Sequence, residues 1–262
     1  MEAHCGQLRP GTRLLKLILP IFAAAFAAAL LSGCGTVTSK FVYPNNINSL
    51  VVIDHKPVYK KRVAVRVFED ARGNESFSGI MLFVLPGCPF GYASYDRPDN
   101  GESFPTIDQF NFTPDEDLAK AAAVSLRRSR LFADAFFTYG GEEASADLVF
   151  EGRVLSTYFK GRKMTYCFSL YGTILWVVGA PYATSLNHLT LEFRLRKRSG
   201  EIIWTHCVDK EDYMTQWIYY RRGQDVKLYA PLMEQAMNES ILDLASTLRS
   251  NPKLLDSAPN GN

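Results

Sequence analysis

The segment "LNHLTLEFRLRKRSGEIIWTHCVDK", residues 186–210, decides the fold. Apolar and polar side chains alternate along its first half, which is the period-two pattern of a strand with one buried face. That face would carry Leu189, Leu191, Phe193 and Leu195. A two-residue turn at Ser199-Gly200 would then pair Leu195 with Trp204, Phe193 with His206, and Leu191 with Val208. The segment therefore predicts an antiparallel hairpin with its aromatic residues on the buried face and Cys207 on the other.

Three further segments have strand patterns. In "RVAVRVFEDARGN", residues 62–74, valines at every second position alternate with arginines. Two more strands are predicted in "ADAFFTYGG", residues 133–141, and "ADLVFEGRVLSTYFKGR", residues 146–162. The second of these would place Leu148, Phe150, Gly152 and Val154 on one face.

Two segments predict helices. "TPDEDLAKAAAVSLRRSRLF" predicts a helix over about 114–131, with Thr113 as N-cap, Pro114 at the first helical position and Glu116 completing a capping box. Apolar residues at helical spacing predict a C-terminal helix over about 226–249. Strands with one helix among them and one after them indicate an α+β domain. We expect a mainly antiparallel sheet of about five strands with two helices packed on one face.

The N-terminal region has the layout of a bacterial export signal. A basic stretch (Arg9, Arg13 and Lys16) precedes the apolar run Leu17–Leu31, which is shorter than the roughly 20 residues of a membrane-spanning helix. Leu31, Ser32, Gly33 and Cys34 resemble a lipobox, the cleavage motif of bacterial lipoproteins. The resemblance implies a diacylglycerol on the Cys34 thiol, cleavage before Cys34 and acylation of the new amino group. An ordinary signal peptide or an uncleaved anchor is the alternative.

The same resemblance predicts the location and the domain boundaries. Gly35 stands where an aspartate commonly marks inner-membrane retention in such lipoproteins, so we expect an outer-membrane protein that faces the periplasm. The predicted order is a signal peptide (1–33), a lipidated tether (34–60), a single α+β periplasmic domain (61–250) and a flexible tail (251–262).

The charge composition argues against nucleic-acid binding. The chain has 29 Lys and Arg and 27 Asp and Glu, and three of the cations and one of the anions precede Cys34. The remainder therefore has no net formal charge, and it lacks the positive field that non-specific nucleic-acid binding requires.

Residues 164–191 contain no charged side chain: "MTYCFSLYGTILWVVGAPYATSLNHLTL". This stretch is either a strand with a buried crossover, an exposed apolar loop that contacts a membrane or a partner, or a transmembrane helix. Exposed apolar patches of this size mark interaction sites, and Trp and Tyr suit a membrane interface. The candidate contact residues are Leu175, Trp176, Val177, Val178 and Tyr182.

The remaining sequence shows no catalytic motif. It has no G-x-S-x-G, H-E-x-x-H, phosphate loop or G-x-G-x-x-G pattern, so we predict a non-enzymatic protein without a cofactor. A metal site is not expected, because no C-x-x-C pair is present and the histidines are scattered. Cys88, Cys167 and Cys207 could supply one disulfide, but the sequence does not select the pair.

The order of elements over roughly 60–250 resembles that of a group of bacterial envelope lipoproteins. Their periplasmic domain is similar to the curli-secretion-channel lipoprotein and to the N-terminal domain of the Tol-system propeller protein. The resemblance implies a binding, scaffolding or transport-accessory module that is held to the membrane by its N-terminal lipid and acts with an envelope protein partner. The alternatives are an oligomeric outer-membrane export component, which a stable monomer would exclude, and a periplasmic enzyme without a recognisable motif.

Overall fold

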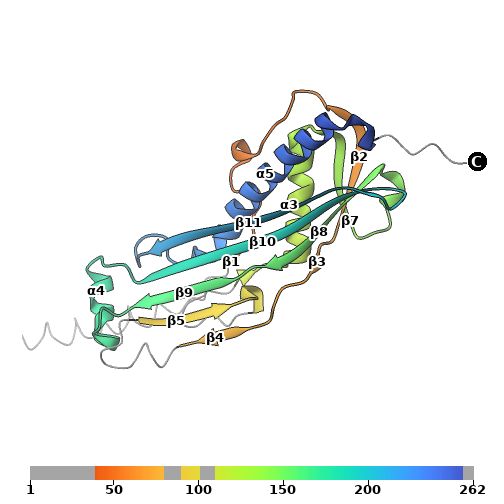
Figure 1. The fold of residues 1–262 in the computed structure, drawn as a ribbon. Helices are drawn as coiled ribbons and strands as arrows, with labels where there is room; N and C mark the ends of the chain where they lie inside the picture. Colours follow the sequence, from red (N-terminus) through yellow and green to blue (C-terminus); the bar gives the residue numbers. More distant parts are fainter. Residues whose placement is uncertain (1–38, 80–89, 101–109, 256–262) are drawn as a thin grey trace, which may run out of the picture. The chain divides into compact units, whose positions relative to one another are not determined.

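The computed structural model describes residues 39–79, 90–100 and 110–255, all within the unit Thr38–Asn262 (Figure 1). Its main element is a nine-stranded mixed sheet in the order β4-β5-β9-β10-β8-β2-β7, with β11 beside β10 and β3 beside β8. Two long helices, α3 and α5, pack on one face of this sheet (Figure 1). The predicted α+β class is confirmed, whereas the expected number of strands was too low.

The strands of this sheet are β2 (Tyr59–Arg66), β3 (Glu69–Asp70), β4 (Ser76–Ser78), β5 (Phe90–Tyr95), β7 (Phe132–Thr138), β8 (Leu148–Ser156), β9 (Phe159–Met164), β10 (Ala183–Lys197) and β11 (Ile202–Gln216). A separate parallel pair joins β1 (Ser39–Lys40) to β6 (Phe110–Asn111).

The β10–β11 hairpin has the predicted register, with Leu195 opposite Trp204, Phe193 opposite His206 and Leu191 opposite Val208. The turn itself differs from the prediction. The N–H of Lys197 donates to the carbonyl of Glu201 at 2.8 Å, which leaves a three-residue loop ending at Gly200, whose φ is +93°. One extra residue on β11 beside this loop then restores the register, because Arg196 pairs with Ile202.

β10 joins two different parts of the sheet. On the side away from β11, its residues Ala183–Asn187 pair with β9 and its residues Thr190–Lys197 pair with β8. We call β2, β3, β7, β8 and the adjoining parts of β10 and β11 the helix-covered half. The distal half consists of β4, β5, β9, Ala183–Asn187 of β10 and the β11 residues paired with them.

Parallel pairing in the helix-covered half was not predicted. β2 lies between β7 and β8 and runs parallel to both. Since α3 lies between β2 and β7 in the chain, it can carry the crossover that parallel strands need. Val63, Ala64 and Val65 are fully buried, as expected for a strand inside the sheet.

The helices lie close to their predicted bounds, as α3 (Pro114–Ser129) and α5 (Tyr229–Ser250), and a 3-10 turn, η5 (Asp225–Leu228), precedes α5. The capping box is wrong in detail. The side chain of Thr113 makes no capping bond, and its backbone N–H donates to the Asp117 carboxylate at 2.8 Å. Glu116 instead accepts bonds from Lys120 and from the Tyr139 hydroxyl.

The core lies between the helices and the odd-numbered face of β10. Phe193 is fully buried, and its ring packs on those of Phe150 and Phe68 at centroid distances of 5.3 and 5.9 Å. Gly152 makes room for this arrangement, because a Cβ there would lie 2.7 Å from the Phe68 ring. Burying each such ring contributes about 1.5–3 kcal/mol to folding.

Within the predicted tether (34–60), the described residues from Ser39 onward pack on the domain. Glu234 of α5 accepts bonds from the Asn46 N–H and the Ser49 hydroxyl, and Asn238 bonds to Ser49 and Val51. In the predicted tail (251–262), residues Pro252–Leu255 form the 3-10 turn η6, and Leu255 is buried. Residues 34–38 and 256–262 lie outside the described residues.

Candidate functional site

Two connections meet at the end of the distal half; the one that contains α4 lies away from α3 and α5, and the other leads from β11 towards α5 (Figure 1). Residues 165–182 link β9 to β10 and contain η4 (Ser169–Gly172) and the short helix α4 (Thr173–Val177). Residues 217–224 follow β11. We call these two segments the tip. They are in contact, because the Tyr219 hydroxyl donates to the carbonyl of Val177 at 2.9 Å.

Partly buried polar contacts hold the tip in one conformation. The indole N–H of Trp176 donates to the carbonyl of Met164 at 2.7 Å, and the Tyr166 hydroxyl donates to the carbonyl of Pro181 at 2.7 Å. Gly172 lies so close to Thr165 that an added Cβ would be 1.9 Å from the Thr165 carbonyl oxygen. The loop is therefore built by specific packing.

The tip also contains strained backbone. Tyr166, Cys167 and Ser169 have φ values of 55°, 65° and 52°, and Arg221 has a φ of 62°. Side chains rarely adopt this left-handed region, and each instance costs on the order of 1 kcal/mol. Strain of this kind persists only where the surroundings over-determine it, and it gathers at functional sites.

The side chains that the tip turns outward are apolar or aromatic. Ile174 is 63% exposed, Val177 61% and Val178 76%, and Tyr171 and Tyr219 are more than two-thirds exposed. Phe168, Leu170 and Tyr220 are exposed as well. A contiguous group of large apolar side chains that is fixed in place yet exposed indicates an interaction surface.

The five predicted contact residues all lie in or beside α4, but only two face solvent. Val177 and Val178 are exposed, whereas Leu175 and Trp176 are half-buried. Tyr182 is buried, and its hydroxyl bonds to the side-chain oxygen of Gln216 at 2.8 Å. The buried-crossover interpretation is wrong for α4. Within the described ranges, no helix has the length and hydropathy needed to cross a bilayer.

Residues of the second connection were missed at the sequence level. Tyr219 and Tyr220 join the exposed patch only because β10 and β11 are paired along their whole length, which brings the end of β11 beside the start of β10. The predicted lipidation motif, Leu31, Ser32, Gly33 and Cys34, lies outside the described residues, as does Cys88. Cys167 and Cys207 are free, exposed thiols.

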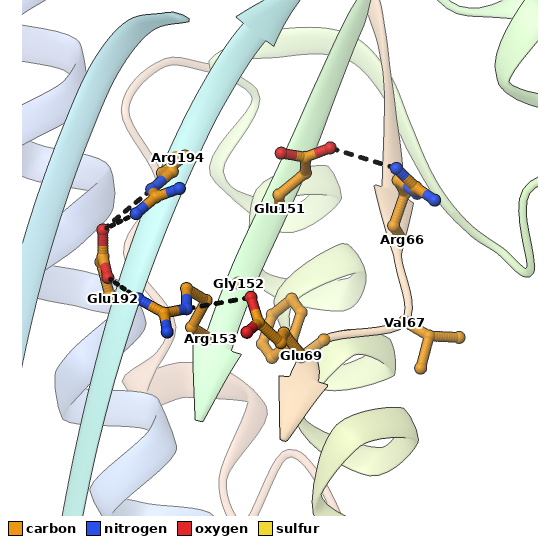
Figure 2. Close-up of a pocket in the computed structure, with 9 residues that line it drawn as sticks. Arg66, Val67, Glu69, Glu151, Gly152, Arg153, Glu192 and Arg194 are labelled. Carbon is orange, nitrogen blue, oxygen red and sulfur yellow. Dashed lines mark hydrogen bonds and ion pairs between the residues drawn. The ribbon is translucent and has the colours of Figure 1, made fainter. Parts of the chain in front are cut away.

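A second feature is a charged pocket of about 270 Å³ on the sheet face opposite the helices (Figure 2). It opens where β2 ends and the chain steps across to β3. Arg153 donates to Glu69 at 2.9 Å and to Glu192 at 3.1 Å, and Arg194 donates to Glu192 at 2.6 Å. Arg66 and Glu151 close the other side of the pocket at 3.3 Å.

The ion pairs of this pocket disfavour acid–base chemistry by Glu192. Hydrogen bonds from Arg194 hold the pKa of Glu192 below its ordinary value. The charge of Glu69 raises the pKa of Arg153. Both side chains therefore stay charged at neutral pH, and the pocket has the character of a structural ion-pair network on an exposed sheet face.

The histidines with described partners lie apart from the tip. His188 pairs with Asp209, and the His206 ring stacks on Trp204 and lies 3.5 Å from Asp243 of α5. Among the described residues, no group of three or more His, Cys, Asp or Glu side chains is arranged to hold a metal ion.

The sequence matches no protein-family model and no curated protein. Two solved structures are similar in parts of their fold. One is a point variant of the PelC dodecamer from Paraburkholderia phytofirmans, with a TM-score of 0.33 and 14% identity over 70% of this chain and 90% of that chain. The other is an uncharacterized protein, with a TM-score of 0.31 and 6% identity over 81% of this chain and 99% of that chain. At these TM-scores neither likeness carries an argument about function.

Proposed function

We propose that this protein is a non-enzymatic envelope lipoprotein, anchored through Cys34, that serves as a binding or scaffolding module for an envelope partner, with the tip as its contact surface for the membrane or for that partner. The observation that carries the proposal is the ordered tip, which keeps Ile174, Val177 and Val178 exposed although burial would be favourable. Strain and specific hydrogen bonds maintain this exposure.

The anchor and the fold are close together in the chain. Ser39 already pairs with Phe110 in β1–β6, only five residues after Cys34. Five extended residues reach at most about 17 Å. An acylated Cys34 would therefore hold the folded domain directly at the membrane surface.

The anchor is tested by replacing Cys34 with Ala in cells fed a labelled fatty acid. We expect an uncleaved precursor without lipid label, and normal labelling of Cys167→Ala as the matched control, because Cys167 is a free thiol within the domain. Normal labelling of Cys34→Ala would contradict the proposed anchor.

The contact surface is tested by photo-crosslinking in intact cells. A photoreactive residue at position 174 in the tip should give a crosslinked product, whereas the same residue at position 139 should not. Tyr139 is a fair control because it is 72% exposed at the end of β7, in the helix-covered half. Equal crosslinking at the two positions would contradict a specific role of the tip.

A further inference from the structure

The charges of the chain are unevenly distributed along the distal half and the tip. Residues 76–95 contain no charged side chain, and residues 157–187 and 212–224 contain five cations and one acid, Asp212. These cations are Lys160, Arg162, Lys163, Arg221 and Arg222. Because the chain after the N-terminal region has no net formal charge as a whole, the excess of cations here is local and gives this end of the sheet a positive field.

The same three segments are rich in aromatic residues. They contain 16 of the 33 Phe, Tyr and Trp residues of the chain. Two of these rings have a cation above them. Lys163 Nζ lies 4.3 Å from the centre of the Tyr182 ring, and Arg221 Cζ lies 5.0 Å from the centre of the Tyr220 ring. Aromatic rings with adjacent cations behind an apolar surface are typical of proteins that lie in a membrane interface.

We propose that the tip seats in an anionic lipid surface. Ile174, Val177 and Val178 enter the boundary between headgroups and acyl chains, and Arg221 and Arg222 meet lipid phosphates. α4 has five residues, too short to cross a bilayer but sufficient for shallow insertion. The tip contains Arg221 and Arg222 and no Asp or Glu, so its charge complements lipid phosphates. An apolar protein groove would supply no such array of anions.

The route of the chain supports a membrane as the occupant. Only Asp225 and Val226 separate the tip from Lys227, which lines a pocket of about 190 Å³ together with Lys40. Lys40 is therefore close to the base of the tip, and Cys34 is six residues before it. This step rests on the proposed lipid anchor: the bilayer that holds Cys34 lies within reach of the root of the tip.

The experiment uses the full chain reconstituted into vesicles of phosphatidylcholine, with or without phosphatidylglycerol, that contain brominated lipid as a fluorescence quencher. Two variants are compared, Val178→Trp in the tip and Tyr139→Trp in the helix-covered half. We expect the added tryptophan to be quenched at position 178 and not at position 139. The quenching at position 178 should be stronger in the vesicles that contain phosphatidylglycerol. The native Trp176, Trp204 and Trp217 give the same background in both variants.

Charge variants distinguish binding of the tip to anionic lipid from non-specific binding of the protein to the vesicle. Arg221→Gln with Arg222→Gln should weaken seating by about fivefold for each neutralised arginine, in the phosphatidylglycerol vesicles only. Arg127→Gln with Arg128→Gln, at the end of α3, should leave the quenching unchanged. Circular dichroism and thermal unfolding confirm that both double variants are folded.

Equal quenching at positions 178 and 139, or none at 178 in either lipid, would overturn the proposal. The proposal would also be overturned if residue 178 became shielded from solvent only after an envelope protein fraction was added. In that case the tip would bind a protein instead of lipid. The quenching test compares two positions in the same full chain, so it measures the tip independently of the state of Cys34. A failed labelling test at Cys34 and a failed quenching test at the tip are therefore separate results.

Discussion

β10 passes through two halves of one sheet, and the same face of the same strand has a different chemistry in each. In the helix-covered half this face presents Leu189, Leu191, Phe193 and Leu195 to α3 and α5. In the distal half it presents Ala183, Ser185 and Asn187, which are equally buried. The first half is stabilised by extensive apolar burial. The second has a small apolar cluster (Ala93, Tyr95 and Phe159) and depends more on strand pairing and polar contacts.

The root of the distal half shows how polar contacts replace a core. Arg72 is buried, and its guanidinium donates to Asp70 at 2.9 Å, to Asp99 at 2.6 Å and to Thr157 at 2.8 Å. Thr157 follows β8 and precedes β9, so this network ties β3 and η2 (Pro98–Asn100) to the point where the two halves meet. The comparison predicts that the distal half can lose its order while the helix-covered half stays folded.

The largest expected effect is on the core of the helix-covered half. Phe193→Ala should lower the free energy of unfolding by about 3–5 kcal/mol, because it leaves a cavity between Phe150 and Phe68. Phe168→Ala in the tip is the matched control and should change it by less than about 0.5 kcal/mol, since this ring is 61% exposed. Urea unfolding measures both, and similar losses for the two variants would refute the comparison.

A second substitution addresses the root of the distal half. Arg72→Met should cost about 3 kcal/mol, because it removes the buried guanidinium whose charged hydrogen bonds join Asp70, Asp99 and Thr157. Hydrogen exchange should show early loss of protection in β5 and β9, with α3 and α5 still protected. Arg153→Met, in the charged pocket, removes ion pairs that are more exposed to solvent than those of Arg72. It should cost less than about 1 kcal/mol. Simultaneous loss of protection throughout the sheet would show that the halves unfold as one unit.

The same network predicts a pH dependence. Hydrogen bonds from Arg72 lower the pKa of Asp70 below the ordinary value of 3.8. A lowered pKa in the folded state means that the stabilisation is complete above the ordinary value and is lost as the pH falls through the folded value. Stability should therefore decrease below about pH 4, and this decrease should be smaller in Arg72→Met. An unchanged acid profile in that variant would contradict the assignment to Asp70.

The smallest expected effect is a gain in stability. Asn187 is fully buried, and neither side-chain polar atom finds a hydrogen-bond partner among the described residues. Asn187→Val should raise the free energy of unfolding by about 1 kcal/mol, because it removes an uncompensated desolvation cost. Asn238→Val should have the opposite sign, because Asn238 bonds to Val51 and Ser49. A destabilised Asn187→Val variant in urea unfolding would contradict this account.

The predictions that succeeded depended on short-range periodicity. The alternation in β10 gave the register of the β10–β11 hairpin, although the turn has three residues and a compensating extra residue on β11. Helical spacing and Pro114 placed α3 and α5 to within a few residues. The parallel pairing of β2 was beyond this reasoning, because its partners β7 and β8 lie more than 60 residues away in the chain.

The lack of charge in residues 164–191 is a property of the sequence, and it marked the tip as unusual before its placement was known. Whether those side chains are buried or exposed depends on what the fold brings against them. Tertiary packing decided that Tyr182 turns inward to Gln216 while Val178 faces solvent, and it brought Tyr219 beside α4. Local patterns report which face of an element is apolar, but burial is settled by contacts between segments that are distant in the chain.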